Sequence, residues 1–96
     1  MTEKVKSKVL EIMALAFEFN GKPTKQVLTG NKPTIFVDFA GHVCELDVRI
    51  YIDGWDFSAN KVVKYMMYLD SPSAAKELDR TLTDLKTIIA KYEENR

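Results

Sequence analysis

The chain has 96 residues, equal numbers of basic and acidic side chains, and a single cysteine. This length predicts one domain over residues 1–96, and a single cysteine excludes an intrachain disulfide bond, which is typical of a reducing, cytoplasmic location. The apolar run over residues 9–17 is too short to cross a bilayer and contains Glu11, so we expect no membrane contact.

The charge is distributed unevenly along the chain. Residues 1–32 carry a net charge of +3, residues 33–60 carry −4 and residues 61–96 carry +1. Phosphate contacts need clustered lysine and arginine, so the acidic middle segment disfavours nucleic-acid binding there.

The first predicted element is a helix over about residues 3–19. Apolar residues recur at helical spacing, at Val5, Val9, Ile12, Ala16 and Phe19. Further apolar residues make the stripe wider than that of an ordinary surface helix, and Asn20-Gly21 supplies a stop. The wide stripe leaves two packings open, one on the same sheet face as a second helix and one on the opposite face.

Two or more strands are predicted next. Residues 24–29 are a candidate edge strand, with a turn at residues 30–31, and residues 34–40 form a second strand. If Gly41-His42 is a tight turn into residues 43–53, then Phe39, Val37 and Ile35 lie opposite Cys44, Leu46 and Val48 on one apolar face. The same register places Asp38 opposite Glu45.

A second hairpin is predicted with its loop at residues 58–61. Ile52 and Ile50 then lie opposite Met67 and Leu69. On the other face, the predicted pairs are Tyr51 with Tyr68, Arg49 with Asp70, and Trp55 with Lys64.

The last predicted element is a long helix that begins with Ser71 as its N-cap and Pro72 at its first position. Its apolar stripe comprises Ala75, Leu78, Leu82, Leu85, Ile89 and Tyr92. The sequence therefore predicts a two-layer α+β fold of α-β-β-β-α order. Its sheet is an antiparallel three-stranded meander, or a four-stranded one if residues 24–29 form a strand.

Strict alternation in the segment CELDVRIYID (residues 44–53) predicts one aliphatic face and one face of acids and tyrosines. Aromatic side chains interleaved with charges are typical of a protein contact patch. We therefore predict a small non-catalytic module that uses this face to bind another protein or a second copy of itself, without a cofactor. The candidate partner-binding residues are Phe36, Arg49, Tyr51, Trp55, Met66 and Tyr68.

Two other functions are open from the same residues. Asp38, Glu45 and Asp47 are candidate ligands for a hard divalent metal ion, in a metal-binding protein or a metal-dependent enzyme. The aromatic residues are also candidate stacking platforms for single-stranded nucleic acid. For the single histidine and cysteine, the pattern favours structural roles over nucleophilic catalysis, with His42 in a turn and Cys44 filling the core.

Overall fold

The computed structural model describes residues 1–21, 32–58 and 61–94. The element order is α1 (Glu3–Asn20), β1 (Thr34–Ala40), a short 3-10 turn η1 (Gly41–Val43), β2 (Glu45–Tyr51), β3 (Val62–Tyr68) and α2 (Ala74–Glu94). The three strands form an antiparallel sheet of order β1-β2-β3, which confirms the predicted α+β meander. The predicted strand at residues 24–29 lies outside the described residues.

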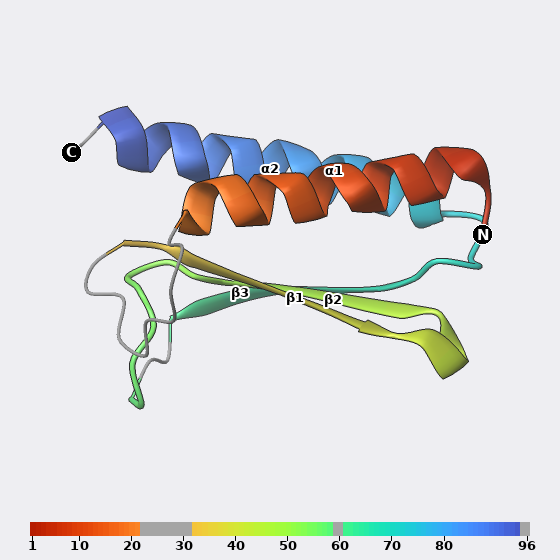
Figure 1. Cartoon of the computed structure of the whole chain (residues 1–96), viewed down its shortest axis with the longest axis horizontal. Coiled ribbons are helices and arrows are strands. Elements are labelled where there is room, and N and C mark those ends of the chain that lie inside the picture. The colour runs from red at the N-terminus through yellow and green to blue at the C-terminus, as the bar shows by residue number, and fades with distance from the viewer. Residues whose placement is uncertain (22–31, 59–60, 95–96) are drawn as a thin grey trace.

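Both helices lie side by side on the same face of the sheet (Figure 1). Helix α1 packs over β1 and helix α2 over β3, and ion pairs join the helices from Lys8 to Asp79 and from Lys86 to Glu11. This arrangement settles the packing question that the wide apolar stripe of α1 left open. No helix in the described part of the chain is both long and apolar enough to span a membrane.

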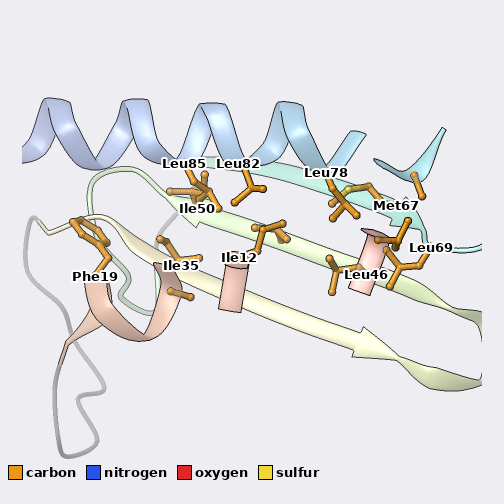
Figure 2. Close-up of a cluster of buried hydrophobic side chains, with 14 residues drawn as sticks. Ile12, Phe19, Ile35, Leu46, Ile50, Met67, Leu69, Leu78, Leu82 and Leu85 are labelled. Carbon is orange, nitrogen blue, oxygen red and sulfur yellow. The ribbon is translucent and has the colours of Figure 1, made fainter. Parts of the chain in front are cut away.

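The core fills the layer between the helices and the sheet (Figure 2). Its fully buried side chains come from all layers: Ile12 from α1, Leu46, Val48 and Ile50 from β2, and Leu78 and Leu85 from α2. The central strand therefore turns its aliphatic residues towards the helices, as the alternating pattern predicts.

Helix α1 begins and ends with local caps. The Thr2 hydroxyl accepts a hydrogen bond from the Val5 amide at 3.1 Å. At the other end, Gly21 takes the left-handed conformation (φ 61°) and its amide donates to the Phe17 carbonyl. The predicted stop at Asn20-Gly21 is confirmed.

The start of α2 differs from the prediction by two residues, because the helix begins at Ala74 and not at Pro72. A turn precedes it. In this turn the Ala74 amide donates to the Ser71 carbonyl, and the Ser73 amide donates to the Ser71 hydroxyl at 3.2 Å.

The predicted register of the first hairpin is wrong by two positions, since Ile35 lies opposite Ile50 and Asp38 opposite Asp47. The connection is longer than a two-residue turn. It comprises η1 followed by Cys44, whose φ of 53° is left-handed. Cys44 is consequently a half-buried turn residue at the margin of the core, not a strand residue inside it.

The predicted register of the second hairpin is wrong by six positions. Arg49 lies opposite Lys64 and Tyr51 opposite Val62, so the predicted pairs with Asp70 and Tyr68 do not form. The chain leaves the strand earlier than predicted, because the Gly54 amide donates to the Tyr51 carbonyl in a turn directly after β2.

The early turn also removes the other predicted pairs of this hairpin. Ile52 is 39% exposed and does not join the core, while Trp55 lies in the connection and not opposite Lys64. Both register errors are even numbers, so every strand side chain keeps its predicted face.

Candidate protein-interaction surface

The sheet face opposite the helices, which we call the open face, carries most of the predicted site. No helix or strand of the described residues lies over it (Figure 1). Its strand residues are Thr34, Phe36, Asp38, Ala40, Glu45, Asp47, Arg49, Tyr51, Val62, Lys64, Met66 and Tyr68. One face of the sheet thus builds the core, and the other presents mixed aromatic, aliphatic and charged side chains.

An aromatic cluster occupies one end of the open face. The Phe36 ring packs edge-on against Tyr51 with 5.1 Å between centroids, and it lies 6.3 Å from the Trp55 ring. Trp55 in turn contacts Phe57 at 5.2 Å. The connection after β2 therefore folds back onto the N-terminal end of β1. It adds the side chains of Trp55 and Phe57 to the aromatic residues of the strands.

Arg49 lies between the aromatic cluster and the acidic residues of the open face. Its guanidinium carbon sits 5.0 Å from the centroid of the Phe36 ring, and its Nη2 forms an ion pair with Asp38 Oδ2 at 3.0 Å. Its Nη1 also donates to the Tyr51 hydroxyl at 3.4 Å. These contacts hold a planar cation against an aromatic ring, an arrangement that favours arginine over lysine.

The centre of the open face holds two opposed carboxylates. Asp47 lies directly across from Asp38, and only the latter is paired with Arg49. Asp47 Oδ1 and Arg49 Nε are shielded from solvent and have no hydrogen-bond partner in the part of the chain that the structure describes. A polar atom in this position costs free energy unless a partner satisfies it.

The other end of the open face is more exposed. Met66 is 53% exposed and Tyr68 is 46% exposed, and both belong to β3 at the edge of the sheet. Glu45 lies opposite Tyr68. Among the described residues, no aromatic ring packs on Tyr68 in the way that Phe36 and Tyr51 pack on each other at the other end.

The structure brings four of the six predicted partner-binding residues together: Phe36, Arg49, Tyr51 and Trp55. Met66 and Tyr68 lie on the same face but at its far end. Phe57, which the sequence also offers as part of an aromatic strip, joins the cluster through Trp55 and is 82% exposed.

The predicted metal ligands are not brought to one point. Among the described residues, no group of three His, Cys, Asp or Glu side chains is placed to hold a metal ion. Glu45 lies opposite Ala40, two register positions away from the Asp38–Asp47 pair. The metal hypothesis stays a prediction without structural support.

His42 is exposed within η1, as predicted for a turn residue, and the Cys44 carbonyl accepts a hydrogen bond from the Leu69 amide at 2.8 Å. Both residues thus belong to the turn that sets the β1–β2 register.

Comparison of the chain with protein-family models, with curated proteins and with solved structures found no match.

Proposed function

We propose that this chain is a small interaction module that binds a protein surface through its open face. The observation that carries the proposal is the difference in burial between the two sheet faces. The core is complete on the helix side, yet the opposite side keeps large apolar side chains in water, including Phe57, Met66 and Tyr68. Exposed aromatic and methionine side chains next to an arginine are enriched at protein interfaces.

The charges of the open face favour a protein over a nucleic acid. Three acids, Asp38, Glu45 and Asp47, share this face with Arg49 and Lys64. Arg49 is already paired with Asp38, so its charge is not free for a phosphate group. Single-strand binders combine stacking rings with a positively charged groove, and the open face offers the rings without that charge.

The polar centre of the open face supports a partner that brings a hydrogen-bond donor. The Asp38 side chain is 66% exposed beside its ion pair with Arg49, so a lysine, arginine or amide side chain of a partner can donate a hydrogen bond to its carboxylate. The favoured partner surface is therefore apolar, with a donor group placed near its centre.

Photo-crosslinking from the open face tests the proposal. The photo-reactive residue p-benzoylphenylalanine replaces Met66 on the open face or Thr83 on the exposed side of α2. In an extract of cells that express the protein, we expect a discrete crosslinked protein from position 66 and none of that size from position 83. Equal crosslinking from both positions, or none from position 66, would overturn the proposal.

A further inference from the structure

The strand pairing arranges the open face as rows that run across the sheet, each with one residue from β1, β2 and β3. In order along the sheet, the rows are Thr34–Tyr51–Val62, Phe36–Arg49–Lys64, Asp38–Asp47–Met66 and Ala40–Glu45–Tyr68. The two inner rows carry opposite charge, and we call them the basic row (Phe36, Arg49, Lys64) and the acidic row (Asp38, Asp47, Met66).

Each inner row keeps a charge that is not paired within the chain. Arg49 forms an ion pair with Asp38 at 3.0 Å. Lys64 and Asp47 form no ion pair with any residue of the ranges 1–21, 32–58 and 61–94. The basic row therefore has one unpaired positive charge, and the acidic row has one unpaired negative charge.

The order of the rows makes the open face complementary to a copy of itself in one orientation. Two sheets that pack face to face keep their strands nearly aligned. A two-fold axis along the strands would place each row against itself, so that Arg49 meets Arg49 and Asp47 meets Asp47 of the other copy. A two-fold axis across the strands, between the inner rows, instead places the basic row of each copy against the acidic row of the other. Charge selects this crosswise axis.

We infer that the partner of the open face is a second copy of this chain, packed face to face about the crosswise axis. The inference rests on the proposed function, because it uses the same face and names the partner. The inner rows of the two copies bring together four basic and four acidic side chains without a net charge: Asp38, Asp47, Arg49 and Lys64 from each copy. A two-fold contact of this kind is the commonest form of closed assembly among soluble proteins.

Side chains of unequal length face each other in this arrangement. Arg49 lies opposite the shorter Asp47 of the second copy, and Tyr68 lies opposite its shorter Val62. Long and short side chains at facing positions interdigitate, which lets two sheets pack about 10 Å apart.

The aromatic end of the open face also meets small side chains of the second copy. The connection after β2 (residues 52–58) projects from the sheet on the side away from the helices (Figure 1), and its Trp55 ring lies 6.3 Å from Phe36. The crosswise axis sets this end against the row of the second copy that contains Ala40. Since Ala40 has the smallest side chain of the open face, the projecting ring faces the position where the second copy leaves most room.

The size of the open face predicts a weak contact. At about 3.4 Å per residue and about 4.8 Å between strands, three strands of seven residues cover a face of about 24 by 14 Å. A standard interface buries about 800 Å² of each partner, and this face is smaller. We therefore expect a reversible dimer with a dissociation constant on the order of micromolar or weaker.

Two charge-reversal variants test the arrangement by sedimentation equilibrium. Asp47→Arg and Arg49→Asp each place like charges opposite each other when the variant pairs with itself, so self-association should weaken by more than roughly tenfold relative to the wild type. In an equimolar mixture, position 47 of each variant faces position 49 of the other with opposite charge, and association should return. A mixture that stays monomeric although circular dichroism shows both variants folded would overturn the inference, and so would a wild type that is monomeric up to roughly 1 mM.

Photo-crosslinking of the purified protein gives a second test, which does not depend on the folding of the charge-reversal variants. Met66 faces Lys64 of the second copy across the crosswise axis. With p-benzoylphenylalanine at position 66, we expect a product of twice the 11.0 kDa chain mass, linked near position 64 of the second copy. A product linked to α1 or α2 would contradict the face-to-face arrangement.

The same crosslink separates this inference from the proposed function. A product that forms only in the cell extract, and that contains a different protein, would overturn the second copy and leave the proposed function standing. No product in the extract or in the purified protein would overturn both.

Discussion

The side-chain amide of Asn20 satisfies both backbone groups of Ile35, donating to its carbonyl at 2.9 Å and accepting from its amide at 3.2 Å. Asn20 is the last residue of α1, so this pair of bonds ties the end of the helix to the edge of the sheet. Ile35 is itself a buried core residue. The contact therefore fixes how far along β1 the helix lies.

We expect Asn20→Ala to lower the free energy of unfolding by about 1–3 kcal/mol, because it leaves an amide and a carbonyl without partners at a partly buried position. Denaturant unfolding monitored by circular dichroism measures the change. Glu18→Ala, on the exposed side of the same helical turn, is the control and should stay within about 0.5 kcal/mol of the wild type. Equal effects of the two substitutions would show that the Asn20 bonds do not hold the layers together.

Ionisation of the Tyr65 hydroxyl makes the stability of the folded state depend on pH in the alkaline range. Burial raises the pKa of Tyr65 from 10.0 to about 12, helped by the hydrogen bond to Asp84 and by its negative charge, and opposed by the positive charge of Arg80. The folded state thus holds the phenolic proton more tightly than the unfolded state. The stabilisation is complete below pH 10.0 and is lost as the pH rises towards about 12.

A comparison of unfolding free energies for the wild type and Tyr65→Phe across this alkaline range checks the expectation. The difference between the two proteins should shrink as the pH rises, because the variant has no phenol to ionise. Tyr68→Phe, which removes an exposed phenol on the opposite sheet face, should keep the wild-type loss. A wild-type curve parallel to that of Tyr65→Phe would rule out the assigned role of the Tyr65–Asp84 bond.

The same leucine-to-alanine change should have very different effects at two positions. Leu78 on α2 is fully buried, whereas Leu10 on α1 is 59% exposed. We expect Leu78→Ala to destabilise the fold by about 2–5 kcal/mol through lost burial and a cavity. Leu10→Ala should change stability by no more than about 0.5 kcal/mol. A large effect at Leu10 would mean that this residue is covered in solution.

Two glycines make a second matched pair. Gly21 has a φ of 61°, and a Cβ added there would lie 3.1 Å from the Glu18 carbonyl oxygen, whereas a Cβ at Gly41 would meet only the Phe39 side chain at 3.5 Å. We expect Gly21→Ala to lower the free energy of unfolding by about 1–2 kcal/mol. Gly41→Ala should be close to neutral, and thermal unfolding of both variants distinguishes the two cases.

The alternation of side chains predicts the two sheet faces correctly, because a period of two survives any register error of an even number of residues. Loop lengths were not predictable in the same way. The left-handed conformation of Cys44 carries no clear sequence signal, and Asp53-Gly54 marks a turn after Tyr51 without fixing the length of the connection, so each shifts a register. Leu46 and Ile50 nevertheless lie in the core as predicted.

The sequence also did not predict which face of the sheet α1 covers. Its apolar residues cover so much of the circumference that they do not select a single face, and Phe17 remains 72% exposed in the fold. Only the stripe through Val5, Ile12, Ala16 and Phe19 is buried. The open face exists because α1 packs beside α2. The exposure of the candidate site therefore depends on which sheet face α1 covers, and periodicity does not predict that face.

Competition in the crosslinking experiment tests the central claim most directly. With the photo-reactive residue at position 66, unlabelled wild-type protein in excess should abolish the crosslink. The double variant Tyr51→Ala/Tyr68→Ala should compete far less well, although both tyrosines lie outside the buried core and the variant is expected to fold. If the folded double variant competes as well as the wild type, the open face is not where the partner binds.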